Sequence, residues 1–397
     1  MTPSTGTTNT AGGESLIGRI VGAGVRAADA AATALAAAGV PAARAVGAER
    51  KAIAAHVAGS PNLVGAVFAN PEPPMPGADM GLGVLVDMVR RPGRPARPIP
   101  VLAPRFAPDA SALTATWLGH ASVLVELDGL RILTDPVLSR RCSPSGLIGP
   151  SRMHPSPVTV ADLPAIDIVL ISHDHYDHLD METVTALAVA SPDAIFVTPV
   201  GVDAHLIAWG ITADRIRSAD WWETLEIEVV TASTPTRLRF TCGPARHFSG
   251  RGPYRNLTQW ASWAVVGPGH RFFFSGDTGY TERFDELGTR LGPFDLTLVA
   301  VGAYDPAWPD VHVTPEEAVA IHRMVSGAGG RDSLFIPIHW GTFNLARHGW
   351  GEPIVRLLPH AARNGTTVAV PTPGGTVDVA SRTGSGLADP RWWEASA

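Results

Sequence analysis

The stretch IDIVLISHDHYDHLD, residues 166–180, decides the fold of this chain. It opens with the continuous apolar run IDIVLIS, which predicts a strand buried on both faces of a sheet. His173 and His175 follow directly, and on an extended segment residues two positions apart project to the same side. Asp177 and His178 come after a turn and can face a second point close by. Imidazole and carboxylate groups in a loop at the end of a strand predict a metal site.

One such loop supplies too few ligands for two metals, so other segments must provide the rest. His247, Asp277 and His339 each follow a predicted strand, in the segments ARHFSGR, SGDTGY and PIHWGTF. A single histidine in such a place is more often a structural residue. Together with the first loop, these residues make five imidazoles and two carboxylates, a set that suits a pair of zinc-like cations.

Strands and helices alternate around these motifs. We expect strands at 113–118, 121–127, 131–135, 166–172, 194–199, 225–230, 237–242, 259–266, 270–276, 295–302 and 333–339, and helices at 181–190, 281–291, 315–325 and 353–363. The third helix has a clear start, because Thr314 can cap it, Pro315 suits its first position and acidic residues follow. No GxGxxG motif follows a strand. The pattern predicts one α/β domain of packed sheets at 112–375.

The rest of the chain is predicted to be peripheral. Residues 1–60 hold a polar, disordered start at 1–13 and an Ala-rich stretch at 15–58. We expect that stretch to form a helical hairpin on the main domain; the alternative is an amphipathic segment on a membrane surface. Residues 61–111 are rich in proline and predict an extended arm packed on the main domain, and residues 376–397 a C-terminal tail.

Composition excludes several classes of protein. The chain has 397 residues, 31 basic against 37 acidic, and a net charge of −6, which argues against general nucleic-acid binding. Cys142 and Cys242 lie 100 residues apart, which rules out a disulfide framework and a cysteine-based zinc site. The start has no basic signal region, and Pro41 interrupts the longest uncharged stretch there. We therefore expect a cytoplasmic protein, with peripheral contact to a membrane as the open question.

The motifs together carry a resemblance to a known family. HxHxDH followed by single His, Asp and His residues at strand ends resembles the metallo-β-lactamase superfamily. The segments LTATWLGHASVLVELDG, ISHDHYDHLD, ARHFSGR, FFFSGDTGY, HVTPEEAV and PIHWGTFNLA look like the N-acyl-phosphatidylethanolamine-hydrolysing phospholipase D family and its bacterial relatives. The resemblance extends from about Ser60 to Gly374. It implies a four-layer αββα sandwich, here with an N-terminal helical and extended extension.

The resemblance also implies a dinuclear metal site. It assigns two zinc ions per subunit, one held by His173, His175 and His247, the other by Asp177, His178 and His339, with Asp277 bridging both. Iron or manganese remain alternatives, because a His/Asp site accepts them too. Asp135 would support the site from behind, since a ligating imidazole needs an acceptor for its other N–H. The alternative for Asp135 is a turn residue before Pro136.

Further residues are expected near the substrate. By the resemblance, His312 lies near the substrate phosphate and would contact substrate or donate a proton to the leaving group; the alternative is a structural role at the start of a helix. Tyr176, Tyr280 and Tyr304 lie inside the site motifs and are candidates to line the cleft. His120 matches a motif position, but strand packing explains it equally well. We expect the core to contain Trp221, Trp222, Trp260, Trp263 and Trp340, and we expect ordinary roles for His56, His154, His205, His270, His322, His348 and His360.

These residues lead to a functional hypothesis. The expected enzyme is a zinc-dependent phosphodiesterase of phospholipase D type, in which Asp277 and His312 are catalytic and a metal-activated hydroxide attacks the phosphodiester. Its substrate would be N-acyl-phosphatidylethanolamine or a related phospholipid, with N-acylethanolamine and phosphatidic acid as products. The alternatives are a hydrolase of a soluble phosphate ester or a sugar-phosphate lactone on the same site, and a catalytically silent scaffold. Relatives form dimers or larger rings, so a homo-oligomer is expected, and no nucleic-acid partner.

Overall fold

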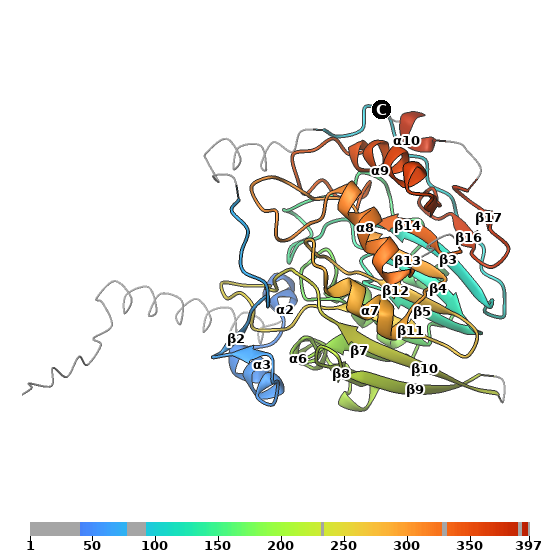
Figure 1. Ribbon diagram of the computed structural model, residues 1–397. Coiled ribbons are helices and arrows are strands. Elements are labelled where there is room, and N and C mark those ends of the chain that lie inside the picture. The colour runs from blue at the N-terminus through green and yellow to red at the C-terminus, as the bar shows by residue number, and fades with distance from the viewer. Residues whose placement is uncertain (1–39, 78–92, 232–233, 328–331, 388–390, 396–397) are drawn as a thin grey trace, which may run out of the picture.

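Two mixed β-sheets face each other in the computed structural model of this protein (Figure 1). The structure describes residues 40–77, 93–231, 234–327, 332–387 and 391–395. The expected disordered start at 1–13 and the part of the Ala-rich stretch before residue 40 therefore lie outside the described residues.

The first sheet is built around the strand of the histidine motif. Within the described residues it has eight strands in the order β17-β16-β3-β4-β5-β6-β7-β8. Pairing is antiparallel from β17 to β5 and parallel from β5 to β8. The strands are β3 (Leu113–Gly119), β4 (Ser122–Leu127), β5 (Leu130–Thr134), β6 (Ile168–Leu170), β7 (Ile195–Pro199), β8 (Ile216–Ala219), β16 (Thr376–Asp378) and β17 (Thr383–Gly384).

The second sheet carries the later ligand candidates. Its order in the described part of the chain is β15-β14-β13-β12-β11-β10-β9, parallel from β15 to β12 and antiparallel from β12 to β9. The strands are β9 (Thr224–Thr231), β10 (Thr234–Gly243), β11 (Ser262–Val266), β12 (Arg271–Phe274), β13 (Leu296–Ala300), β14 (Leu334–Ile338) and β15 (Thr367–Val368). A short hairpin of β1 (Leu63–Val64) and β2 (Val67–Phe68) forms a separate ladder.

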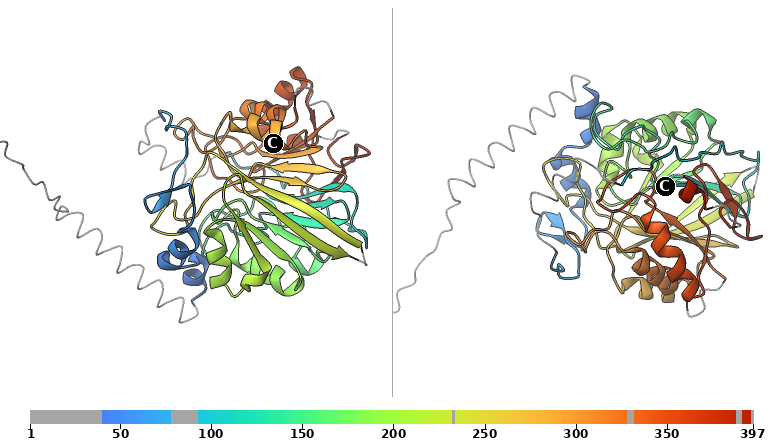
Figure 2. Two further views of the ribbon diagram at one scale, coloured as in Figure 1. Left: turned by 60° about the horizontal axis from the view of Figure 1, so that its bottom comes forward. Right: turned by 90° about the horizontal axis from the view of Figure 1, so that it is seen from above.

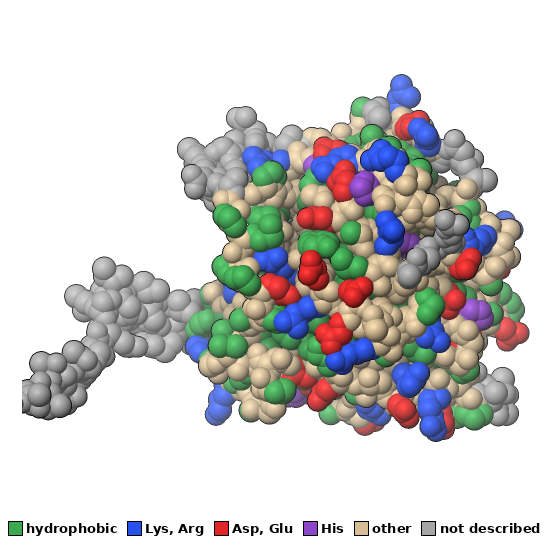
Figure 3. Space-filling model, in the orientation of Figure 1, with side chains coloured by type: hydrophobic (Ala, Val, Ile, Leu, Met, Phe, Trp, Pro, Cys, Tyr) green, Lys and Arg blue, Asp and Glu red, His purple; other side chains and the backbone are tan. Residues whose placement is uncertain are grey.

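Helices cover the outer face of each sheet, which completes four layers (Figure 2). The first sheet is covered by α5 (Met181–Ala190) and α6 (Val202–Ala208), and the second by α7 (Arg283–Leu291), α8 (Pro315–Val325) and α9 (Glu352–Arg363). On the face over these last three helices, acidic and basic side chains are interspersed (Figure 3). The αββα sandwich predicted from the sequence is confirmed.

The core between the sheets consists of large apolar side chains. Trp117, Phe240, Trp263 and Phe274 are each 1% exposed or less and belong to one continuous cluster. Of the tryptophans expected in the core, four are buried and Trp222 is half-buried. The two cysteines are buried, and they form no disulfide in the described part of the chain. Burial of this apolar surface is the main contribution to the stability of the sandwich.

Local signals explain where the well-predicted helices begin. Thr314 accepts a hydrogen bond from the Glu317 N–H, and the Glu317 carboxylate accepts one from the Thr314 N–H, so α8 starts with a complete capping box. The Asp180 side chain accepts from the Thr183 N–H at the start of α5. Because Asp180 is the last residue of the histidine motif, this cap also fixes where the ligand loop ends.

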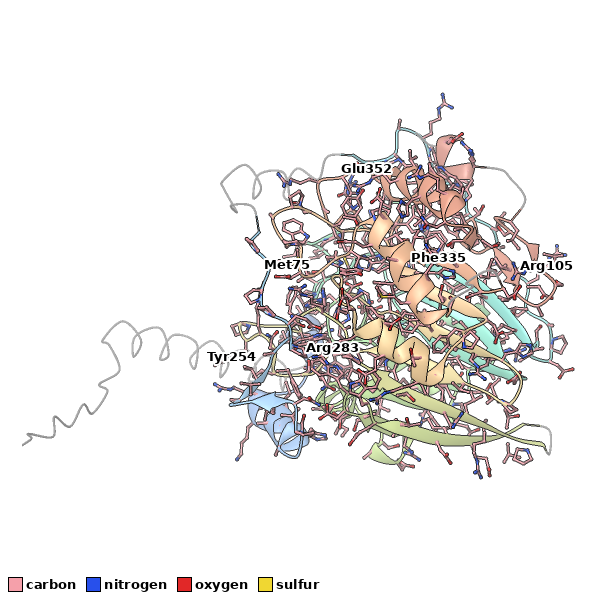
Figure 4. The ribbon with its side chains drawn as sticks, in the orientation of Figure 1. Met75, Arg105, Tyr254, Arg283, Phe335 and Glu352 are labelled. Carbon is pink, nitrogen blue, oxygen red and sulfur yellow. The ribbon has the colours of Figure 1, made fainter. Side chains whose placement is uncertain are left out.

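The N-terminal extension packs on the main domain. Its described part forms α2 (Pro41–Val46) and α3 (Arg50–Val57), and α3 lies against α6. The proline-rich arm has little regular structure where it is described, and its residues 69–77 cross the loops of the second sheet. Met75, Tyr254 and Arg283 lie along this side of the molecule (Figure 4).

The C-terminal segment is not a tail, which corrects the expected domain end at residue 375. β16 pairs with β3 and extends the first sheet, and α10 (Trp392–Ala395) packs on the core. Trp392 stacks on Trp340, with ring centroids 5.2 Å apart, and is 4% exposed.

Other unpredicted elements are α6, β8 and the 3-10 turns Val160–Asp162 and Ala213–Arg215. Among the described residues, no helix combines the length and apolar character that a membrane crossing requires.

Candidate metal centre

All seven predicted metal ligands come together at one edge of the sandwich, in loops that follow strands of both sheets. His173, His175, Asp177 and His178 lie between β6 and α5, whereas His247 follows β10, Asp277 follows β12 and His339 follows β14. Asp277 can approach the first sheet because Gly276 precedes it: a Cβ there would lie 2.6 Å from the Ser172 Cβ, and its φ is +54°. Only glycine fits that position without displacing a neighbour.

One group of three imidazoles forms the first half of the centre. The His173 Nε2 lies 2.9 Å from the His175 Nδ1, and the His247 Nε2 lies 3.3 Å from the same atom. The other ring nitrogen of His247 lies 2.9 Å from the Val311 carbonyl oxygen, which orients Nε2 toward the group. Three nitrogen atoms that converge in this way are a suitable face for one cation.

A second group contains a carboxylate and two imidazoles. The Asp177 Oδ2 lies 3.3 Å from the His339 Nε2 and 3.6 Å from the His178 Nε2. The ligand atoms of this group also lie within 4.8 Å of one another. His120 also belongs to this group, so the structure adds it to the triad that the resemblance implies.

Asp277 lies between the two groups. Its Oδ2 is 3.1 Å from the Nε2 atoms of both His178 and His339, 3.7 Å from that of His247 and 4.0 Å from that of His173. Within the described structure, its Oδ1 has no hydrogen-bond partner although it is buried. The same is true of the buried His178 Nε2. Buried polar atoms normally have a partner, so these atoms fit a bound cation pair with Asp277 as the bridge.

Asp135 supports this arrangement from behind. Its Oδ2 is 2.6 Å from the His178 Nδ1, and it accepts hydrogen bonds from both the Ser172 hydroxyl and the Ser172 N–H. The Ser172 Oγ also lies 2.9 Å from the His173 Nδ1. Asp135 therefore orients two imidazoles so that their Nε2 atoms face inward, which is the role predicted for it.

Charge is concentrated at the centre. Burial raises the pKa of Asp277, but the nearby imidazoles of His178 and His339 outweigh this effect and hold the pKa well below its usual range. Burial lowers the pKa of His339, yet the carboxylates of Asp277 and Asp177 outweigh it and raise the pKa to about 8. The carboxylates thus attract positive charge strongly, whether it comes from protons or from metal cations.

His312 also faces the centre. Its Nδ1 is buried without a hydrogen-bond partner in the described structure, 3.9 Å from the Asp277 Oδ2. Its ring lies 5.2 Å from that of His247 and 5.1 Å from that of His339. Burial lowers the pKa of His312 to about 3, reinforced by His339 and opposed by Asp277, so the imidazole is neutral. The loop position before α8 therefore brings a neutral imidazole to the site.

His120 belongs to the site, although its sequence context did not separate this role from strand packing. Its Nε2 lies 3.0 Å from the Asp177 Oδ2, and its backbone carbonyl accepts from the His339 N–H. His120, Asp135 and His339 all have positive φ angles, of 55°, 31° and 63°. Such backbone strain concentrates at functional sites. The LGHAS motif was the available signal.

A buried arginine, Arg251, holds the histidine loop in place; it ends the ARHFSGR motif, in which only His247 was predicted to have a role. The Arg251 Nη1 donates to the carbonyl oxygens of Asp174 and Leu179, and its Nε and Nη2 donate to that of Ala45 in α2. Asp174 accepts from the Gly250 N–H and the Thr258 hydroxyl. His205, for which we expected an ordinary role, lies 3.4 Å from Asp174. The ligand loop is thus tied to α2, α6 and the loop after β10.

An open pocket leads to the centre. His175, Asp177, Tyr176, Phe248 and Arg255 line it, together with Cys142, Pro150 and Leu345. Tyr176 therefore lies where a cleft residue was predicted. The two other tyrosines are not among the residues that line this pocket: the Tyr304 hydroxyl donates to Glu352, and the Tyr280 carbonyl accepts from Arg246. These contacts place both tyrosines in the surrounding loops, and a contact of either one with substrate stays a prediction.

Comparisons with known proteins agree with this fold. A sequence profile of the "Beta-lactamase superfamily domain" matches residues 130–340. An uncharacterised protein of Mycobacterium tuberculosis (strain ATCC 25618 / H37Rv) is 49% identical over 347 residues, which is 86% of this chain and 90% of that protein.

Two further similarities are more distant. The N-acyl-phosphatidylethanolamine-hydrolyzing phospholipase D 1 of Caenorhabditis elegans is 41% identical over 242 residues, which cover 59% of this chain and 65% of that protein. The solved structure of an isothiocyanate hydrolase from Delia radicum gut bacteria has the same fold, with a TM-score of 0.51 at 20% identity over 67% of this chain and 98% of that one. The chain belongs to the beta-lactamase superfamily, with the fold and the His/Asp cluster of its metal-dependent hydrolases.

Proposed function

We propose that this protein is a metal-dependent phosphodiesterase of phospholipase D type. It hydrolyses phospholipids such as N-acyl-phosphatidylethanolamine and releases N-acylethanolamine and phosphatidic acid. The observation that carries the proposal is the convergence of His178, His339, His247 and His173 on the Asp277 Oδ2, at 3.1 to 4.0 Å. The 41% identity to the Caenorhabditis elegans phospholipase supports this substrate class.

Two cations in this centre, which we propose to be zinc, would supply Lewis acidity toward the phosphate and a nucleophilic hydroxide at neutral pH. The donor set of imidazoles and carboxylates suits zinc and also accepts iron or manganese. The residues that would hold them are His173, His175 and His247 on one side, Asp177, His178 and His339 on the other, and Asp277 between them.

The surrounding residues have separate tasks in the hydrolysis. A water oxygen attacks phosphorus, the bond between phosphorus and the N-acylethanolamine oxygen breaks, and a proton of the water ends on that leaving oxygen. Asp277, which lies between the two groups of imidazoles, would help to orient the attacking water. Because His312 is neutral, it suits a hydrogen bond to the substrate phosphate better than proton donation. Arg255 places a positive charge at the pocket mouth, which favours an anionic substrate.

The test is hydrolysis of N-acyl-phosphatidylethanolamine by the purified protein, with both products identified by mass spectrometry. We expect His312→Gln to lower kcat by about 10² to 10³, because a hydrogen bond to the substrate phosphate is lost, while bound metal is unchanged. His360→Gln, on the outer helix α9, is the matched control and should retain full activity. Turnover of bis-(p-nitrophenyl) phosphate or of a lactone without turnover of the phospholipid would favour a soluble substrate and contradict the lipid assignment.

A further inference from the structure

A loop with two exposed apolar side chains projects beside the pocket. Leu147 is 86% exposed and Ile148 is 71% exposed. The base of the loop is ordered, since Arg141 and Ser151 form a β-bridge and the Cys142 N–H donates to the Pro150 carbonyl. This hairpin-like base therefore holds the two side chains in the solvent. Exposure of such apolar surface to water is unfavourable and often marks an interaction site.

The loop is placed at the entrance to the candidate metal centre. Cys142 and Pro150, the two residues at its base, line the same pocket as His175 and Asp177. A phospholipid whose phosphodiester enters this pocket keeps its acyl chains outside. The exposed loop tip projects from the same base residues, Cys142 and Pro150, that line the pocket. The lipid headgroup would thus contact the charged interior of the pocket, and the acyl chains would contact the apolar loop tip at its rim.

The loop segment itself contains only basic charged residues, although Ser139 at its base donates to the carboxylates of Asp180 and Glu182. Residues 139–152 (SRRCSPSGLIGPSR) contain three arginines and no acidic residue. Arg140 is exposed at the base, and Arg141 donates from its Nη1 to the Gly149 carbonyl at 2.6 Å. Two exposed apolar side chains at the loop tip, with arginines where the loop begins and ends, are complementary to a membrane surface that carries anionic headgroups.

We propose that the loop at residues 143–149 inserts Leu147 and Ile148 into the surface of an anionic lipid bilayer, so that the phospholipid enters the pocket without leaving the membrane. This inference deepens the proposed function and rests on it for the identity of the substrate. Binding to the membrane itself is a separate property that can be measured without turnover.

The test compares the full chain with the double variant Leu147→Ser/Ile148→Ser. The matched control is Val189→Ser/Val355→Ser, which removes two apolar side chains that are 83% and 57% exposed on the outer helices α5 and α9. Binding is measured by co-sedimentation with vesicles of phosphatidylcholine and phosphatidylglycerol. Turnover is measured with N-acyl-phosphatidylethanolamine in the same vesicles and with bis-(p-nitrophenyl) phosphate in solution.

We expect the loop variant to bind vesicles at least about tenfold more weakly and to lose vesicle turnover in proportion, while hydrolysis of the soluble ester and the control variant stay unchanged. Vesicle binding equal to that of the unaltered protein overturns the proposal. A loss of self-association instead of vesicle binding also overturns it and assigns the loop to a second copy of the chain. Absence of all phosphodiester hydrolysis, with vesicle binding still dependent on the loop, rejects the proposed function but retains the membrane contact.

Discussion

Replacing Arg251 by methionine should destabilise the protein strongly, although this residue is not a predicted ligand. The substitution keeps an unbranched side chain of similar length and removes the guanidinium. That group is buried, donates to the carbonyl oxygens of Ala45, Asp174 and Leu179, and lies 4.1 Å from the ring centroid of Tyr176. The carbonyl oxygens of Asp174 and Leu179 belong to the loop that holds four of the seven ligand candidates.

The size of the effect follows from these contacts. Three buried carbonyl oxygens lose their charged donor, at a cost of roughly 1–3 kcal/mol each. Removing the guanidinium also removes the cost of burying its charge, which offsets part of the loss; burial lowers the pKa of Arg251 itself. We therefore expect the free energy of unfolding to fall by about 3–5 kcal/mol, a large part of the ~5–15 kcal/mol typical of folded proteins. Arg251→Lys should recover only part of this, because an ammonium group cannot reproduce the planar fork.

Urea unfolding of the metal-free protein measures this change as a shift in the midpoint at constant slope. Arg255→Met is the control, since Arg255 is exposed and stacks only on Phe248 at 4.6 Å among the described rings, and it should change the free energy by less than about 0.5 kcal/mol. Zinc binding to the Arg251 variant should weaken as well. If Arg251→Met unfolds at the same urea concentration as the unaltered protein, the proposed support of the ligand loop is refuted.

Three further predictions concern the centre and the C-terminus. Asp135→Asn should weaken metal binding about 10- to 100-fold in competition with a chelating dye, because His178 and His173 lose their fixed orientation; unchanged affinity would contradict this. Removing metal with a chelator should lower the melting temperature by roughly 5–10 °C, and restoring zinc should reverse it in calorimetry. Trp392→Ala should cost about 3–5 kcal/mol in chemical unfolding, because this side chain is buried against Trp117 and Trp340; a cost near zero would show that the C-terminal segment is dispensable.

Elements with strong local signals could be predicted closely from the sequence. The helices expected at 181–190 and 315–325 have the bounds of α5 and α8, because Asp180 and Thr314 are caps that act within one turn. The strand expected at 259–266 is shorter in the structure. The N–H groups of Gln259 and Ala261 donate to the carbonyl oxygens of Val200 and Ser172, which lie in loops rather than in a strand.

Other parts depend on distant contacts that no local pattern contains. α6 begins after Gly201 with no side-chain cap, and β16 joins the first sheet only through its pairing with β3. The same distinction holds at the site. The histidine motif and the residues at strand ends share one edge by sheet geometry, so their convergence could be inferred. The roles of His120 and Arg251 come from contacts with residues far away in the sequence, which the LGHAS and ARHFSGR motifs do not contain.

The pairing of β16 with β3 has a consequence for how the protein is made. Thr376 in β16 lies opposite Thr116 in β3, the first strand of the sandwich. β3 therefore pairs with a strand that is synthesised 260 residues later. During synthesis the edge of β3 therefore stays open until these further 260 residues have been made, and an open edge is a template for wrong pairing. We expect the nascent chain to need chaperone protection until β16 is made, and the finished domain, in which β3 lies beside the β16–β17 hairpin, to tolerate circular permutation.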